Sequence, residues 1–181
     1  MSKIIITGGT VLTINDADDV HFGGHVVLDG DRIAAVGEGA YNGPVGNGDQ
    51  VIDAASQIVM PGLIDLHYHT AIGKGFCDHL PLLESLEEFW YPSIRALDPE
   101  TAYWAALNSY AESIKNGVTT VNDMYRQLGA LGRAAEEIGI RAVLSNDVAT
   151  AEHNLDTLED NKEAFQAKHG KANGRMARMG L

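Results

Sequence analysis

The sequence predicts an α/β protein with a parallel sheet, preceded by a portion built from β-strands alone. From residue 60 on, apolar strand-like runs alternate with helical patterns at intervals of about 20–30 residues, which is typical of successive right-handed βαβ units. Before residue 60 the apolar runs are short and separated by turn residues. With 181 residues and 45% hydrophobic content, the chain is long enough for one sizeable core. We therefore divide it into a β portion, residues 1–59, and an α/β portion, residues 60–181.

The charge balance disfavours two classes of partner. Thirteen basic against 25 acidic residues give a net charge of −12, whereas nucleic acids and anionic membranes are bound by clustered Lys and Arg. The single cysteine, Cys77, excludes an internal disulfide and suits a reducing compartment. The N-terminal residues lack a signal-peptide core, and no run approaches the roughly 20 apolar residues of a membrane span. We expect a cytoplasmic protein that binds neither nucleic acid nor membrane.

The β portion contains six predicted strands, at residues 4–7, 11–14, 25–28, 32–36, 51–53 and 58–59. Asp29-Gly30-Asp31, between the third and fourth strands, predicts a tight hairpin because Asp-Gly tolerates positive φ. Residues 37–50 hold five glycines and one proline and are predicted to form a loop. We interpret His21 and His25 as surface or strand residues without a catalytic role.

The rest of the chain is organised around residues 60–70, where a Pro-Gly turn precedes an apolar run that ends in His67 and His69. Side chains two residues apart in a strand share a face, so Asp65 is expected beside both histidines. The opposite face, expected under a helix layer, carries Ile64, Leu66 and Tyr68. The histidine Cα atoms would lie about 6.6 Å apart, and two imidazoles at that separation converge on one divalent ion at about 2.0–2.1 Å from each nitrogen. The spacing alone leaves two ordinary strand-end histidines as the alternative.

Residues 59–69 read Val-Met-Pro-Gly-Leu-Ile-Asp-Leu-His-Tyr-His and resemble the first barrel strand of the amidohydrolase superfamily. The superfamily pattern there is Pro-Gly-x-(Ile/Val/Leu)-(Asp/Asn)-x-His-x-His, and its members are metal-dependent hydrolases on a TIM-type barrel. The resemblance implies that His67 and His69 ligate a divalent metal, zinc or iron. It also implies that residues 1–59 belong to a small β-sandwich and that residues 60–181 form the first three to four β/α units of the barrel.

Residues 75–86 narrow the resemblance to one branch. They read Gly-Phe-Cys-Asp-His-Leu-Pro-Leu-Leu-Glu-Ser-Leu and are similar to the Arg-Gly-x-x-Asp-Asp-(Leu/x)-Pro-Leu-x-x-Trp-Leu of methylthioadenosine/S-adenosylhomocysteine deaminases, guanine-type deaminases and triazine chlorohydrolases. The chain departs from that pattern with Lys74 near the usual Arg, His79 for the second Asp and Ser85 for the Trp. These departures affect which substrate is expected, but they do not change the assignment to this branch. We interpret His79 as a loop residue outside the metal site and Cys77 as a packed loop thiol.

Helices are predicted on both sides of residue 97. Leu82, Leu86 and Phe89 fall at helical spacing and predict a short amphipathic helix over residues 81–90. A long helix begins after Asp98 as N-cap, with Pro99 in its first position. Its expected apolar face comprises Tyr103, Ala106, Leu107, Tyr110 and Ile114, and Asn116-Gly117 is expected to end it.

The remaining chain continues the alternation. Strands are predicted at residues 118–123 and 140–145, separated by a helix over 127–138 that Gly139 caps. A further helix over about 155–169 and a fourth strand after Gly174 follow.

Several further residues are candidates for contact with a ligand. Trp90 and Tyr91 are interpreted as substrate-binding residues for a flat ring, with aromatic core as the alternative. Trp104 is interpreted as core, with a place in the same pocket as the alternative. Asp123 follows a strand and is interpreted as a turn former, with support of the metal site as the alternative. His153 is expected to be exposed.

The resemblance implies an aminohydrolase of a purine-, pterin- or triazine-like ring that uses a metal-bound hydroxide. In the deaminase branch the site is completed by a histidine and an aspartate after later strands, assisted by a further histidine and a glutamate, all expected beyond Leu181. Catalytic acid/base residues are therefore not assigned within this chain. We expect the chain to be part of a longer polypeptide or a truncated product, inactive alone.

Two alternatives stay open. A hydantoinase- or dihydroorotase-type cyclic amidase would use two metals bridged by a carboxylated lysine, which would also lie beyond this chain. A truncated, inactive fragment is the other alternative. Because half a barrel exposes an unpaired strand edge and apolar helix faces, we expect a homo-oligomer.

Overall fold

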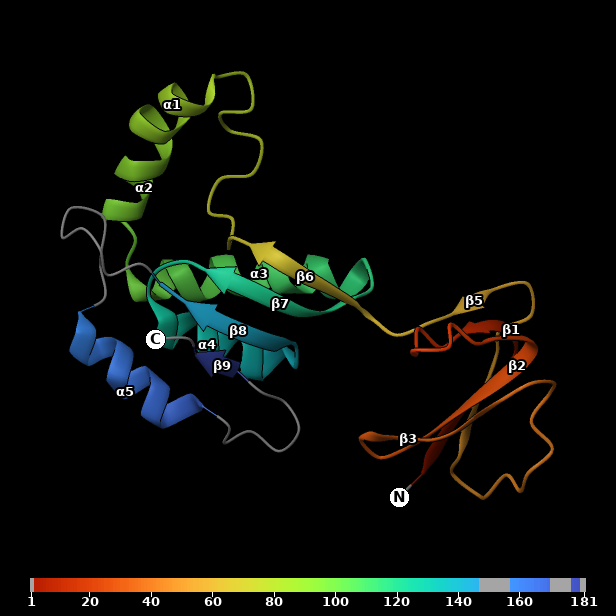
Figure 1. The fold of residues 1–181 in the computed structure, drawn as a ribbon. Helices are drawn as coiled ribbons and strands as arrows, with labels where there is room; N and C mark the ends of the chain where they lie inside the picture. The colour runs from red at the N-terminus through yellow and green to blue at the C-terminus, as the bar shows by residue number, and fades with distance from the viewer. Residues whose placement is uncertain (1, 147–156, 170–176, 180–181) are drawn as a thin grey trace. The chain divides into compact units, whose positions relative to one another are not determined.

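The computed structural model describes residues 2–146, 157–169 and 177–179. The chain folds as two compact units, Met1–Pro61 (unit 1) and Gly62–Leu181 (unit 2), and each is described by itself (Figure 1). None of the helices in the described ranges is both long enough and apolar enough to cross a membrane.

Unit 1 is built on one sheet of five strands: β1 (Lys3–Leu12), β2 (Val20–Asp29), β3 (Arg32–Gly37), β4 (Gln50–Asp53) and β5 (Ile58–Val59). The order is β3-β2-β1-β4, and β5 pairs with the far end of β1. β1, β2 and β3 are antiparallel, whereas β4 and β5 run parallel to β1. The hairpin predicted around Gly30 is confirmed, because β2 and β3 pair up to Asp29 and Arg32, and Gly30 has a φ of 60°.

The prediction of two separate strands over residues 4–14 was wrong, because β1 is one strand interrupted by bulges. Its register with β2 shifts between Thr7 and Gly9 and again between Gly9 and Val11. Gly8 adopts a φ of 88°, which L-residues rarely occupy. A bulge inserts a residue and bends a strand without ending its pairing. The glycines therefore mark a bend rather than a turn.

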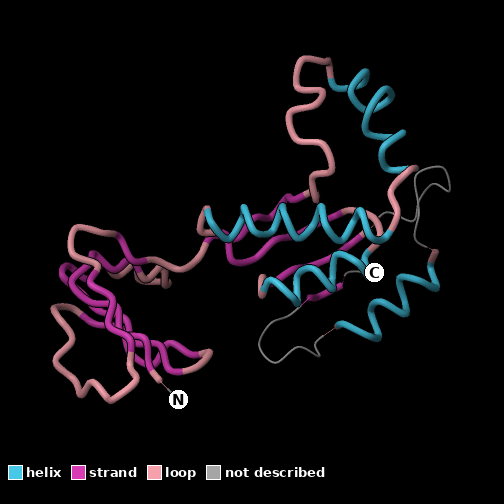
Figure 2. The backbone as a smooth tube through the Cα atoms, turned by 180° about the vertical axis from the view of Figure 1, so that it is seen from behind, coloured by secondary structure: helices cyan, strands magenta, loops and turns pink. Residues whose placement is uncertain are grey.

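Unit 2 is a parallel sheet whose strands follow one another in chain order: β6 (Leu63–Tyr68), β7 (Val118–Met124), β8 (Arg141–Ser145) and β9 (Ala177–Met179). The connecting helices are α3 (Pro99–Lys115), α4 (Leu128–Ile138) and α5 (Leu158–Lys168). Helices α3 and α4 cover the same face of the sheet (Figures 1 and 2). These elements confirm the predicted alternation. Gly174 and residues 155–156 lie outside the described residues.

The ends of the helices follow local signals in the sequence. Asp98 caps α3 by accepting a hydrogen bond from the Thr101 amide at 2.8 Å. At the other end of α3, Gly117 has a φ of 82°. Gly139 ends α4 with a φ of 83°, as predicted. Thr157 caps α5 in a capping box with Asp160.

The core of unit 2 lies between the sheet and helices α3 and α4. It includes buried side chains from both helices and from β7 and β8, namely Ala102, Tyr103, Ala106, Tyr110, Val121, Leu128, Leu131, Ala134, Ala135, Ala142 and Leu144. The expected apolar face of α3 is confirmed up to Tyr110. Ile114 is 41% exposed, because it lies in the last turn of α3, beyond the residues that pack in the core.

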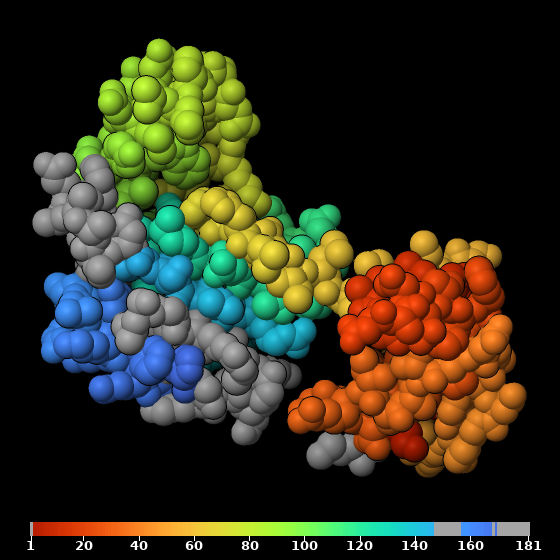
Figure 3. Space-filling view, in the orientation of Figure 1, coloured from red at the N-terminus to blue at the C-terminus, as the bar shows by residue number. Residues whose placement is uncertain are grey.

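The helical segment after the histidine strand is longer and less packed than predicted. It runs through α1 (Leu82–Ser85), a π-helical turn η1 (Leu86–Trp90) and α2 (Tyr91–Arg95). Figure 3 shows this segment standing out from the rest of unit 2. Leu82 is 72% exposed, so the expected apolar face does not pack along its whole length. A π-turn has a wider repeat than an α-helix, so residues before and after it no longer share one face.

Candidate metal centre

His67 and His69 lie side by side at the end of β6. Their ring centroids are 4.9 Å apart, and the ring planes are nearly perpendicular at 87°. His67 is the second-last residue of β6, and His69 is the first residue after the strand. Both side chains are exposed in the described chain. The structure therefore brings the two predicted residues together at the carboxyl end of a parallel strand.

The orientation of His69 is fixed from the neighbouring strand. Its Nδ1 lies 2.7 Å from the carbonyl oxygen of Met124, the last residue of β7. A carbonyl can only accept, so Nδ1 carries the proton, and in the neutral ring Nε2 keeps a free lone pair. Metal-binding histidines commonly have their other nitrogen held in this way. Sequence analysis missed Met124 because it contributes a backbone carbonyl, which has no residue-type signal.

A bulge in β6 removes Asp65 from the histidine face, so the predicted grouping was wrong. Asp65 pairs with Val121 and Tyr68 with Asp123, so that two residues of β6, 66 and 67, lie opposite one residue of β7. Val121 and Asp123 are both buried under the helices, and Asp65 is aligned with that side. Its carboxylate accepts a hydrogen bond from the His67 amide at 3.2 Å. An extra residue reverses the alternation of a strand.

The same bulge explains why the opposite face is only partly covered. Of the three residues expected under a helix layer, Tyr68 packs against the core, with its ring centroid 5.9 Å from that of Tyr110 on α3. Ile64 and Leu66 are 61% and 74% exposed, so their predicted burial was wrong for the described chain. The Leu66 carbonyl accepts a hydrogen bond from the Asn122 side chain at 3.0 Å. This bond satisfies a backbone group where the register is shifted.

A buried polar cluster lies directly behind the histidines. Asp123 is 0% exposed and accepts hydrogen bonds from the Thr70 amide at 3.1 Å, the Thr70 hydroxyl at 2.6 Å and the Tyr110 hydroxyl at 2.8 Å. Burial raises the pKa of Asp123, and burial also raises the pKa of Tyr110 well above its usual value. The interpretation of Asp123 as a turn former was wrong, because it lies inside β7 with long-range partners.

The remaining candidates lie apart from this cluster or outside the described residues. Trp90 and Tyr91 are half-buried at the junction of η1 and α2, and the Trp90 ring meets Phe89 edge to face at 5.1 Å. Their role as substrate-binding residues stays a prediction. Cys77 is buried, as expected for a packed loop thiol, and His79 is exposed. His153 lies outside the described residues.

No third ligand accompanies the histidines in the described chain. Across residues 2–146, 157–169 and 177–179, no group of three or more His, Cys, Asp or Glu side chains is placed to hold a metal ion. Two imidazoles therefore form the whole donor set described. Imidazole suits zinc and iron, and catalytic zinc sites commonly have three protein ligands. The pair fits part of such a site.

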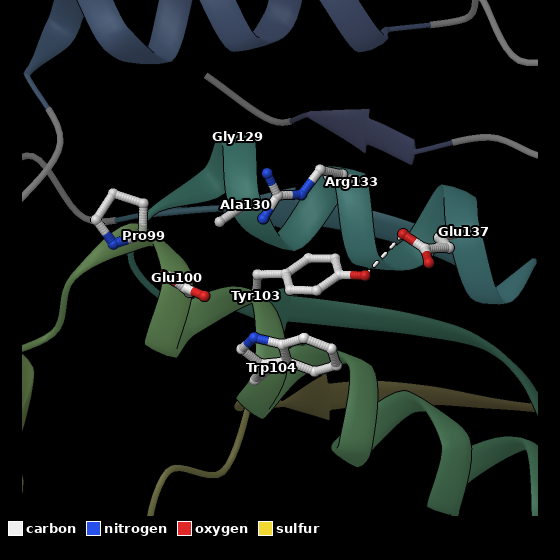
Figure 4. Close-up of a pocket in the computed structure, with 8 residues that line it drawn as sticks. All are labelled: Pro99, Glu100, Tyr103, Trp104, Gly129, Ala130, Arg133 and Glu137. Carbon is white, nitrogen blue, oxygen red and sulfur yellow. Dashed lines mark hydrogen bonds between the residues drawn. The ribbon is translucent and has the colours of Figure 1, made fainter.

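A groove of about 590 Å³ lies between α3 and α4, and neither His67 nor His69 lines it. Figure 4 shows its side chains: the Arg133 guanidinium lies 4.1 Å from the Tyr103 ring centroid, and the Tyr103 hydroxyl donates to Glu137 at 2.7 Å. Trp104 lines this groove and is 58% exposed, so its interpretation as core was wrong. It lies on α3 next to the buried Tyr103, one step outside the packed face.

Residues 58–181 match the model of the amidohydrolase family, and the chain belongs to that family. Among curated relatives, it is 35% identical to a 5-methylthioadenosine/S-adenosylhomocysteine deaminase of Symbiobacterium thermophilum, over 99% of this chain and 42% of the relative. It is 36% identical to a 5'-deoxyadenosine deaminase of Methanosarcina acetivorans, with the same coverage of 99% and 42%. The chain thus spans less than half the length of these relatives.

Solved structures share the fold. One is the atrazine chlorohydrolase of Arthrobacter aurescens TC1 complexed with zinc, which the chain matches with a TM-score of 0.73 and 23% identity over 98% of this chain and 46% of that one. This likeness supports the α/β class that the sequence predicts.

Proposed function

We propose that the protein containing this chain is a divalent-metal-dependent aminohydrolase that acts on a purine-, pterin- or triazine-like ring. The observation that carries the proposal is the His67–His69 pair at the end of a parallel strand, with His69 held through Nδ1 so that Nε2 is free. The deaminase names of the two relatives support the reaction class and an aminated ring as substrate.

His67 and His69 would hold the ion, zinc or iron, through ring nitrogens. When bound, the ion supplies Lewis acidity that activates water near neutral pH. Met124 keeps the His69 tautomer through its carbonyl. Trp90 and Tyr91 are proposed to contact the flat ring of the substrate. The zinc in the matched chlorohydrolase structure supports a divalent ion.

The architecture supports placing this site in a barrel. The four parallel strands of unit 2 follow chain order, and α3 and α4 cover one face of the sheet. A doubly wound sheet would instead reverse its order and carry helices on both faces. We infer that unit 2 comprises the first three β/α units and the fourth strand of a TIM-type barrel. Residues 1–59 are inferred to be one part of a small β-sandwich. The homo-oligomer and the cytoplasmic location stay predictions.

Metal content tests the ligand assignment. In the full-length gene product, His67→Ala and His69→Ala are each expected to lose bound metal, measured by elemental analysis. His79→Ala is the matched control, because His79 is an exposed loop histidine, and it is expected to keep the metal. An unchanged metal content in the His67 and His69 variants would refute the assignment.

Ammonia release tests the substrate class. Full-length protein is expected to release ammonia from aminated purines, pterins or triazines, and the His67 variant is expected not to. Activity only on hydantoins or dihydropyrimidines would identify the cyclic amidase alternative instead.

A further inference from the structure

Asp123 is tied to the residue that follows His69. Thr70 has two hydrogen-bond donors, and both donate to the Asp123 carboxylate: its amide at 3.1 Å and its hydroxyl at 2.6 Å. Thr70 and Asp123 are both 0% exposed. Because a buried carboxylate without donors costs free energy, this link constrains the backbone of residue 70 strongly.

A second link joins the same two strand ends. The His69 ring donates to the carbonyl of Met124, the residue after Asp123. Two consecutive residues after β6 are therefore held by two consecutive residues at the end of β7. The two bonds from Thr70 fix the position of the backbone, and the single bond from His69 fixes the ring and its tautomer.

The third donor to Asp123 comes from α3. The Tyr110 hydroxyl donates to the carboxylate at 2.8 Å and also interacts with the Thr70 hydroxyl, whereas no hydrogen bond between the described residues joins it to His69. It completes the donors of the buried carboxylate, so its loss should affect stability. It is not in the path from Asp123 to the histidine.

We propose that Asp123 is a positioning residue for His69: by holding Thr70 through two hydrogen bonds, it keeps the His69 ring bonded to Met124 and leaves Nε2 as the metal-binding nitrogen. The metal-binding part of this statement rests on the proposed function. The orientation of the ring does not, because it is a property of the chain without metal.

Two variants cut the link, and two others serve as controls. Asp123→Asn replaces one acceptor oxygen with a donor, and Thr70→Val removes the hydroxyl with little change in shape. Thr70→Ser keeps the hydroxyl and should rescue. Tyr110→Phe removes one donor to Asp123 and lowers stability, but it keeps both hydrogen-bonding groups of Thr70. If Asp123→Asn does not fold, the comparison of Thr70→Val with Thr70→Ser decides the outcome.

Two measurements on the metal-free full-length gene product give the readout. Imidazole nitrogen NMR signals report the tautomer of His69 without metal, with assignments from the His67→Ala and His69→Ala variants. A Zn²⁺ titration followed on the same signals reports affinity at these histidines. In wild type, Thr70→Ser and Tyr110→Phe, we expect a protonated Nδ1 and equal affinity. In Thr70→Val and Asp123→Asn, we expect mixed tautomers and Zn²⁺ binding about 10- to 100-fold weaker, as for loss of other groups that orient metal ligands.

The outcomes separate the two proposals. If Zn²⁺ does not perturb His67 or His69 in wild type, the metal assignment fails, whereas the tautomer comparison still tests the role of Asp123. If folded Thr70→Val keeps the Nδ1-protonated ring and wild-type affinity, the positioning role is overturned. Equal losses in Thr70→Val and Tyr110→Phe, in proportion to stability, would also overturn it.

Discussion

Tyr110→Phe is expected to destabilise unit 2 through a single lost hydrogen bond. Tyr110 is 0% exposed, and its hydroxyl donates to the Asp123 carboxylate at 2.8 Å. Phenylalanine keeps the ring and its packing against Tyr68, so the change removes a donor without opening a cavity larger than the lost oxygen. The carboxylate is then left with Thr70 as its only described partner.

The expected loss follows from the type of bond. A buried hydrogen bond to a charged group contributes about 1.5–3 kcal/mol to the free energy of unfolding. For a chain of this size each kcal/mol shifts the melting temperature by about 2–4 °C, so the midpoint should fall by about 3–12 °C. Thermal unfolding followed by circular dichroism at neutral pH measures this directly.

Tyr103→Phe is the matched control on the same helix. Its hydroxyl donates to the exposed Glu137 rather than to a buried carboxylate, so a smaller fall is expected. A melting temperature for Tyr110→Phe that equals wild type, or that exceeds that of Tyr103→Phe, would refute the view that the Asp123 cluster needs all three donors.

Further predictions concern other elements. Gly139→Ala should lower the free energy of unfolding by about 1–2 kcal/mol, because an L-residue is strained at a φ of 83°. Gly129→Ala should instead raise it by about 0.5–1 kcal/mol, because Gly129 lies inside α4 and a Cβ there would meet nothing within 4 Å. Urea unfolding measures both changes, and equal effects would contradict the assigned C-cap. Hydrogen bonds from Thr101 lower the pKa of Asp98 below its ordinary 3.8, so this cap stabilises α3 above the unfolded pKa and its contribution is lost as pH falls through the folded pKa. The melting-temperature difference between wild type and Asp98→Ala should therefore be full at pH 7 and vanish in strong acid; a difference independent of pH would contradict this. The 181-residue chain alone should release no ammonia, and it should self-associate because Leu66, Phe76 and Leu82 are exposed apolar side chains. A monomer by light scattering that also turns over substrate would contradict this prediction.

The sequence predicts those features of this fold that are encoded locally. The cap at Asp98 and the positive φ at Gly139 each depend on a few neighbouring residues, so both were predicted correctly. The bulge in β6 depends on the pairing with β7, more than 50 residues away, and strict alternation therefore misplaced Asp65. Asp123 has the same difficulty: an aspartate near a strand end favours a turn until its partners Thr70 and Tyr110 are known.

In the candidate site, too, features set by neighbouring residues could be predicted, whereas features set by distant partners could not. The proximity of His67 and His69 could be predicted from their spacing, because the two candidate ligands lie within three residues of one another. The carbonyl that orients His69 belongs to a residue type without any signal for such a role. The exposure of Trp104 was also missed, because the sequence alone does not distinguish an exposed aromatic residue from a buried one beside it on the same helix.

The winding of unit 2 has a consequence for the order of events during synthesis. Because β6, β7, β8 and β9 follow chain order in the sheet, each new strand emerges from the ribosome when its partner is already made. Elongation at about 5–20 residues per second allows much more time than helix formation or strand pairing requires. Ordering can therefore proceed in step with translation, because each strand after β6 can pair as soon as it is made. Among the described strands, the two unpaired edges of the growing sheet are that of β6 and that of the strand made last.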